Sequence, residues 1–134
     1  FYVRGELALN FRNNLQVNLN GELNSYETNG EAEPWHLPAF TAGLNSVYTL
    51  KNKLKFRADL DYIGERVAFS KIVNLDLPNT LKGYVDLGLG IEYLYNSRIS
   101  AFINANNLLN SDYDYYLGYR TQNVNVLFGL SYQF

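Results

Sequence analysis

The last twelve residues of the chain alternate strictly between two kinds of side chain. The even positions are apolar: Val124, Val126, Phe128, Leu130, Tyr132 and Phe134. The odd positions are polar or small, except for Leu127. Successive side chains of a β-strand point to opposite faces, so this period of two predicts one strand over residues 123–134, with an apolar face and a polar face.

The length of this strand restricts its surroundings. In a soluble antiparallel sheet, the apolar face covers a core and the other face is solvated. A strand of about 10–12 residues, however, is long enough to cross a bilayer at a tilt. Its second face is also too hydrophilic and too small to pack another layer. We therefore expect the apolar face of residues 123–134 to contact lipid.

The same period recurs in six earlier segments, which predicts about seven strands in all. These segments are residues 3–12, 15–26, 39–50, 83–95 and 98–106, together with a segment that begins at Leu54. One face of the last segment has four charged side chains in succession: Lys55, Arg57, Asp59 and Asp61. Because such charges need water or ion pairs rather than a dry core, we predict an all-β fold, an antiparallel up-and-down transmembrane β-barrel. A soluble lipid-binding barrel would instead have the apolar side chains inside.

Short and long connections alternate along the chain. Turns are predicted at Asn13-Asn14, Lys51-Asn52-Lys53 and Asn96-Ser97, and long loops near residues 27–37, 66–82 and 108–122. Bacterial outer-membrane barrels have short periplasmic turns, long extracellular loops, an even number of strands and both termini in the periplasm. We therefore expect a periplasmic carboxyl terminus and extracellular long loops. Residues 1–134 would form the C-terminal part of a larger barrel domain, with at least one strand preceding Phe1.

Aromatic residues are expected to form two belts at the membrane interfaces. The predicted periplasmic belt contains Phe11, Tyr48, Phe56, Tyr93, Tyr95, Tyr132 and Phe134, and the opposite belt contains Tyr2, Tyr26, Phe40 and Tyr62.

Composition and motifs argue against several other functions. A net charge of −2 gives no electrostatic basis for binding nucleic acid, and the absence of cysteine argues against thiolate metal sites. The only histidine, His36, lies in an acidic loop with Glu31 and Glu33, in a spacing that fits no established metal motif. Gly88 and Gly90 lie within a strand and lack the following helix of a phosphate loop, so they indicate curvature or close backbone approach. No Ser/His/Asp constellation is present, and we predict no enzyme, catalytic residue, metal site or cofactor.

The end of the chain resembles the end of TonB-dependent outer-membrane receptors. The resemblance is carried by Asn106-Asn107-Leu108-Leu109-Asn110, then Tyr113, then Gly118-Tyr119-Arg120, and finally Gly129-Leu130-Ser131-Tyr132-Gln133-Phe134. Leu109 replaces the phenylalanine usual in that family, and Leu127 replaces a polar residue often found two positions before the glycine. Gly129, Tyr132 and Phe134 also resemble the carboxyl-terminal signal that the barrel-assembly machinery reads.

The resemblance implies a Gram-negative outer-membrane transporter for a scarce ligand such as a metal chelate, a vitamin or a glycan. The family has an amino-terminal plug domain, to which nothing in this sequence corresponds. The implied partners are outer-membrane lipid, the barrel-assembly machinery, the remaining strands of the same barrel and other outer-membrane subunits. Candidate extracellular contacts to a ligand or partner are Trp35, Tyr113, Tyr115, Tyr116 and Tyr119, whose alternative role is to pack the loops themselves. Two other functions stay open: a plugless barrel that is a structural or interaction subunit of an outer-membrane complex, and a small eight-strand membrane barrel.

Overall fold

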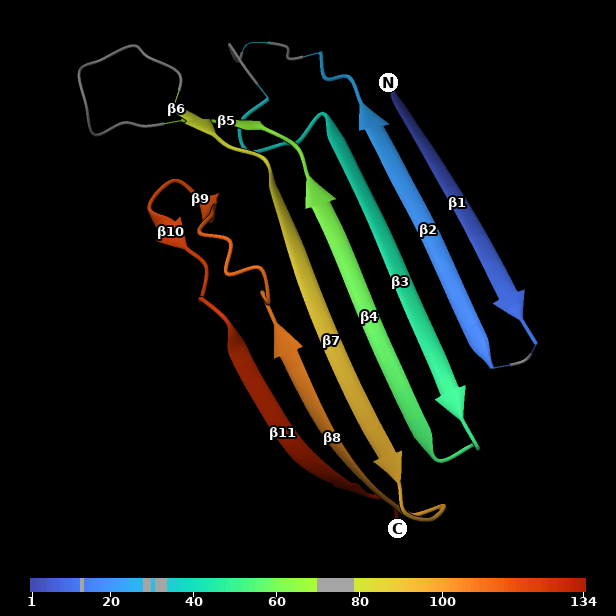
Figure 1. Ribbon diagram of the computed structural model, residues 1–134. Helices are drawn as coiled ribbons and strands as arrows, with labels where there is room; N and C mark the ends of the chain where they lie inside the picture. Colours follow the sequence, from blue (N-terminus) through green and yellow to red (C-terminus); the bar gives the residue numbers. More distant parts are fainter. Residues whose placement is uncertain (13, 28–29, 31–33, 70–78) are drawn as a thin grey trace.

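The computed structural model describes residues 1–12, 14–27, 30, 34–69 and 79–134. Seven long strands form one antiparallel sheet in chain order: β1 (Tyr2–Phe11), β2 (Leu15–Asn24), β3 (Phe40–Leu50), β4 (Leu54–Ile63), β7 (Tyr84–Leu94), β8 (Ile99–Asn106) and β11 (Asn125–Tyr132) (Figure 1). The seven predicted strands are therefore confirmed. The sheet is open, because β1 and β11 form its two edges.

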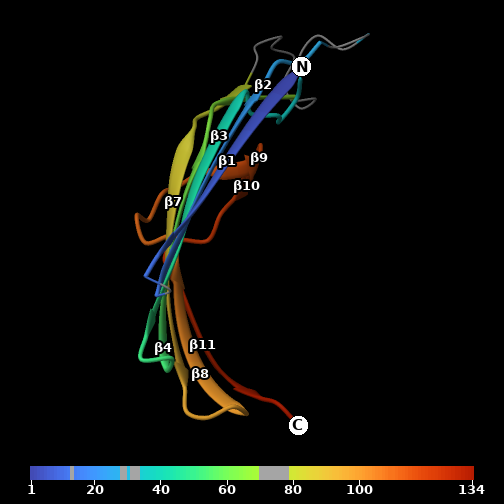
Figure 2. The ribbon, with the colours of Figure 1, turned by 90° about the vertical axis from the view of Figure 1, so that its right-hand side faces the viewer.

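The sheet is a curved wall with two different ends. Figure 2 shows it bowed along its length. The long connections lie at the end where the chain starts, and the short turns lie at the end that holds the carboxyl terminus (Figure 1). The described part of the chain contains no helix that is long and apolar enough to span a membrane.

One face of the wall is apolar and uncovered. The strand register aligns one leucine from each of five neighbouring strands in a single row: Leu7, Leu19, Leu44, Leu60 and Leu87. Among the described residues, the only buried apolar side chains are Ala68, Leu81, Tyr84 and Tyr113, which all lie at the long-connection end. Within the described ranges, no second layer therefore covers the apolar face of the strands, as expected for a surface that contacts lipid.

The opposite face is polar. The register places Asn20, Gly43, Asp61 and Asp86 side by side on four successive strands. The Asn45 amide donates to an Asp59 carboxylate oxygen at 3.0 Å, and the side chains of Lys55 and Glu92 form an ion pair at 3.5 Å. The prediction that the charged face carries water or paired ions agrees with this arrangement.

Glycines on the polar face admit bulky neighbours. The ring of Phe102 on β8 lies over Gly129 on β11, and a Cβ atom at Gly129 would come within 2.6 Å of that ring. A Cβ at Gly90 would come equally close to the Asn104 side chain. The predicted close backbone approach is not seen at these glycines: the neighbour of Gly90 is a side chain, and a Cβ at Gly88 would meet only ordinary contacts.

The strand ends differ from the predicted ones by one or two residues, and β11 is the clearest case. It covers residues 125–132 rather than the predicted 123–134, because its only neighbour in the described sheet, β8, is limited to residues 99–106 by the structure on either side. The Asn96 side-chain oxygen accepts the amides of Arg98 and Ile99 in the turn before β8, and Asn107 has a positive φ of 50° after it. The predicted turns at 51–53 and 96–97 are confirmed, whereas Asn13 of the first turn lies outside the described residues.

Two pairs of rings from the predicted aromatic belts lie at opposite ends of β3 and β4, while the belts as a whole stay a prediction. Phe40 and Tyr62 have ring centroids 5.8 Å apart near the long connections. Tyr48 and Phe56 have centroids 6.3 Å apart near the short turn. Both pairs belong to the apolar face, as the alternation predicts.

Two long connections contain short hairpins that the sequence pattern does not reveal. β5 (Arg66–Ala68) pairs with β6 (Asn79–Leu81), and β9 (Asp114–Tyr116) pairs with β10 (Tyr119–Arg120). We call the second one the aromatic hairpin. These strands have only two or three residues, too few for periodicity to be detected.

Candidate functional site

The connection after β8 is anchored by the buried side chain of Asn107. It is 3% exposed, its amide donates to the carbonyl oxygens of Ser111 (3.0 Å) and Gln122 (2.9 Å), and its oxygen accepts the Ser111 amide (2.9 Å). Asparagine tolerates the positive φ required here. One side chain thus holds both ends of the loop, which gives the asparagine-rich element a structural role.

Tyr113 attaches this loop to the polar face of the wall. Its ring stacks on that of Tyr84 at the start of β7, with centroids 3.5 Å apart and planes 7° apart. Its hydroxyl donates to a carboxylate oxygen of Asp86 at 2.8 Å. Burial raises the pKa of Tyr113 above its usual range, and the hydrogen bond to Asp86 adds to this shift because the phenol must keep its proton to donate.

The aromatic hairpin continues from Tyr113 and presents three exposed tyrosines. Gly118, with a φ of +81°, makes the turn, and its amide donates to the Asp114 carboxylate at 3.1 Å. Tyr115, Tyr116 and Tyr119 are 53%, 59% and 72% exposed. The hairpin thus offers aromatic surface on a fixed support.

Arg66 of β5 supports the aromatic hairpin from the neighbouring connection. Its two terminal NH groups donate to the carbonyl oxygens of Asp114 (2.9 Å) and Tyr115 (3.1 Å). Its guanidinium carbon lies 5.4 Å from the centroid of the Tyr84 ring, within the range of a cation–π contact.

The first long connection meets both of the others. The ring of His36 lies edge-on to Tyr116, with centroids 5.1 Å apart, and the ring of Trp35 lies at the same distance from Phe69. The backbone amide of His36 donates to the carbonyl oxygen of Val67 at 2.6 Å. Trp35 and His36 therefore pack against neighbouring loops.

No group of three His, Asp or Glu side chains suitable for a metal ion occurs in the part of the chain that the structure describes. Glu31 and Glu33, the two carboxylates considered with His36, lie outside the described residues. The prediction that this loop holds no metal site is therefore not tested.

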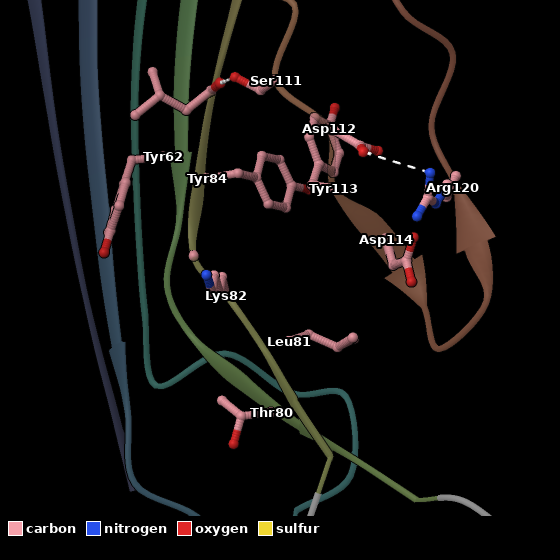
Figure 3. A pocket seen from close by; sticks show the side chains of 12 residues that line it. Tyr62, Thr80, Leu81, Lys82, Tyr84, Ser111, Asp112, Tyr113, Asp114 and Arg120 are labelled. Carbon is pink, nitrogen blue, oxygen red and sulfur yellow. Dashed lines mark hydrogen bonds and ion pairs between the residues drawn. The ribbon is translucent and has the colours of Figure 1, made fainter.

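An open hollow of about 620 Å³ separates the aromatic hairpin from the start of β7 (Figure 3). Its walls include Tyr84, Lys82 and Ser111 on one side and Asp114 and Arg120 on the other. Arg120 forms an exposed ion pair with Asp112 at 3.6 Å. A hollow of this size with an aromatic wall and charges of both signs can hold a small polar ligand.

The predicted site residues fall into two groups. The five aromatic candidates, Trp35, Tyr113, Tyr115, Tyr116 and Tyr119, gather at the long-connection end, although Tyr113 is only 8% exposed and its hydroxyl is already bonded. Gly129 lies in the middle of β11, Tyr132 is its last residue and Phe134 follows it, and their role in assembly stays a prediction.

Sequence reasoning missed Arg66, Tyr84 and Asp86 as members of the site. Tyr84 and Asp86 belong to a strand whose pattern indicates only which face they occupy. Arg66 lies in a segment without periodicity, and it meets the hairpin 48 residues further along the chain. No local signal in the sequence points to these contacts.

No protein-family model matches the sequence, and no curated protein matches it. Solved structures do match the fold. The pyoverdine receptor FpvA of Pseudomonas aeruginosa PAO1 matches with a TM-score of 0.78 and 17% identity, over 98% of this chain and 21% of that chain. The ferric-catecholate import receptor Fiu of E. coli K12 matches with a TM-score of 0.76 and 20% identity, over 98% and 20%. The ferric enterobactin receptor PfeA of P. aeruginosa matches with a TM-score of 0.75 and 15% identity, over 98% and 22%.

These matches cover nearly all of this chain but only about a fifth of each receptor. All are TonB-dependent outer-membrane receptors. The resemblance drawn from the carboxyl-terminal motifs is confirmed at the level of the fold: the chain has the fold of part of the barrel of TonB-dependent outer-membrane receptors.

Proposed function

We propose that this chain is the C-terminal part of the barrel of a TonB-dependent transporter that imports a scarce ligand across the bacterial outer membrane. The observation that carries the proposal is the seven-strand antiparallel wall, with an uncovered apolar face and a polar face, which matches receptor barrels over 98% of the chain. The matched receptors are named for pyoverdine, ferric catecholates and ferric enterobactin. A metal chelate is accordingly the first ligand to test, before a vitamin or a glycan. We assign the chain no enzymatic role.

The proposed orientation places the long connections outside the cell and the carboxyl terminus in the periplasm. Outer-membrane barrels keep short turns on the periplasmic side, and the short turns here lie at the end that holds the carboxyl terminus. Residues 1–134 contain no cysteine. In a version of the complete protein in which every cysteine outside these residues is replaced by serine, a membrane-impermeant maleimide can report single introduced cysteines on intact cells. Tyr119→Cys should react and Ser97→Cys should not. The reverse pattern would contradict the orientation.

The ligand would meet the open hollow, whose lining includes Tyr84 and Arg120, and the exposed tyrosines of the aromatic hairpin, which are not part of that lining. Tyr115, Tyr116 and Tyr119 offer ring faces and hydroxyl groups, and Arg120 offers a cation. Aromatic surface with a few polar groups is the usual lining of a small-molecule site. The buried Tyr113, and Trp35 through its contact with Phe69, would support this surface.

The other proposed partners follow from the wall itself. Lipid would contact the apolar face, and the further strands of the barrel would pair with the free edges of β1 and β11. The barrel-assembly machinery would recognise Gly129, Tyr132 and Phe134.

The decisive experiment is the intact mass of the natural protein extracted from outer membrane, with peptide mapping of everything that precedes Phe1. A polypeptide about five times as long, with a plug domain upstream, would support the transporter. A large barrel without a plug would refute gated transport and indicate a structural subunit. A mass equal to this chain plus one strand would refute both and indicate an eight-strand barrel.

A further inference from the structure

Arg66 is a buried cation without a carboxylate partner among the described residues. The residue is 5% exposed, and its Nε atom has no hydrogen-bond partner in the part of the chain that the structure describes. Burying a charge is costly unless hydrogen bonds compensate it. Here the compensation comes from the carbonyl oxygens of Asp114 and Tyr115 and from the ring of Tyr84. The arginine therefore binds the backbone of β9 rather than an acidic side chain.

The two carbonyl groups belong to successive residues, which gives the contact a defined geometry. A guanidinium group is a rigid planar fork, whereas the ammonium group of lysine is a compact charge on a flexible chain. The hydrogen bonds from Arg66 to two successive carbonyl groups fix the direction of β9. They thereby fix which way the side chains of Tyr115 and Tyr116 point.

The residue that follows Arg66 contacts a different loop. The carbonyl oxygen of Val67 accepts the amide of His36 at 2.6 Å, and the His36 ring meets Tyr116 of the aromatic hairpin at 5.1 Å. β5 lies in the long connection after β4. It therefore binds the long connection after β8 through Arg66 and the long connection after β2 through Val67. The His36–Tyr116 contact joins those two connections directly, so each of the three long connections contacts the other two.

We propose that Arg66 is a positioning residue that holds the aromatic hairpin in place and makes the three long connections move as one unit. The role follows from the contacts of the loops and does not depend on which ligand the protein carries. A ligand that engages the tyrosines of the hairpin would consequently also act on the loop that carries His36.

The test measures loop motion by distances between pairs of spin labels in the full-length protein folded in lipid vesicles. One label is placed at Leu37 of the first connection, which is 48% exposed, and another at Tyr119 of the hairpin, which is 72% exposed. Each is paired with a reference label at the exposed Ser97 in the turn at the opposite end. Both distance distributions should be narrow in the otherwise unchanged protein, and a broad distribution for either would overturn the proposal.

Arg66→Lys keeps the charge but loses the fork, so both distributions should lose their narrow peak, including that of Leu37, which Arg66 does not contact. The matched control is Arg120→Lys on the same hairpin, because Arg120 is exposed and forms only an exposed ion pair with Asp112; both peaks should persist. Broadening at Tyr119 alone would show that the loops are not coupled, and narrow peaks at both labels would show that only the charge matters. Either result would overturn the proposal.

A second variant keeps the test informative if Arg66→Lys does not insert into the membrane. Tyr116→Ala removes the ring contact to His36 and leaves the bonds of Arg66 to β9 unchanged. The Tyr119 peak should then stay narrow. A broad Tyr119 distribution in Tyr116→Ala would show that the ring contact, rather than Arg66, holds the hairpin.

Discussion

A charge placed at Leu19 should destabilise the barrel far more than the same charge on the neighbouring residue. β2 runs from Leu15 to Asn24 and spans roughly 30 Å at about 3.4 Å per residue. Leu19 is near its midpoint, in the row of leucines on the apolar face. A strand tilted by about 45° then places this side chain close to the bilayer midplane.

Arginine on the lipid face costs about 2–4 kcal/mol at the midplane and about 0–1 kcal/mol near the interfaces. Leu19→Arg should therefore lower the folding equilibrium constant roughly 30- to 700-fold, at about 1.4 kcal/mol per factor of ten. Leu23→Arg, one residue from the strand end, should cost much less. Asn18→Arg should be nearly neutral because Asn18 lies on the polar face, opposite Asn45.

The measurement is denaturant unfolding of the full-length protein, folded into phosphatidylcholine vesicles, for the three variants. The reasoning about faces fails if Asn18→Arg costs as much as Leu19→Arg. The reasoning about depth fails if Leu23→Arg costs as much as Leu19→Arg.

Three further results are expected. Gly129→Ala should cost about 1–3 kcal/mol because its methyl group meets the ring of Phe102, and Phe102→Ala in the same protein should remove most of that cost in unfolding experiments. The raised pKa of Tyr113 means that its contribution to loop stability is complete below pH of about 10, the ordinary tyrosine value, and is lost as the pH rises beyond it. Hydrogen exchange of the loop should show this decline, and Tyr113→Phe should abolish it. Asn107→Gly keeps the positive φ but removes three hydrogen bonds of a buried amide, so it should speed exchange throughout the loop. Asn110→Gly, at an exposed position with the same φ, removes only a long bond of 3.4 Å from the Val124 amide and should speed exchange much less.

The wall was predictable from the sequence because its cause is local. Alternation of apolar and polar residues places each side chain on a face, and asparagine-rich turns separate the strands. The strand ends were less accurate because each end depends on the partner strand, as β11 depends on the turn at Asn96 and on the backbone of Asn107.

The candidate site was predictable only in part. The abundance of tyrosine after Asn110 indicated an aromatic loop, and the structure places those residues together. The supporting contacts join residues far apart in sequence, such as Tyr84 with Tyr113 and Arg66 with the backbone of Tyr115. Such contacts arise from the arrangement of the loops in space, which hydrophobic periodicity and residue propensities do not predict.

The two faces of the wall specify different aspects of strand pairing. If the register of one strand slipped by one residue, its polar side chains would turn toward lipid. The apolar face therefore determines which alternate residues of each strand face outward. A slip of two residues would keep every apolar side chain outside, and lipid would not oppose it. On the polar face the same slip would bring Phe102 opposite Leu127 or Ser131 instead of Gly129, and only the glycine leaves room for its ring. The membrane thus permits only register shifts by an even number of residues, and steric fit inside the barrel selects a single register among those that remain.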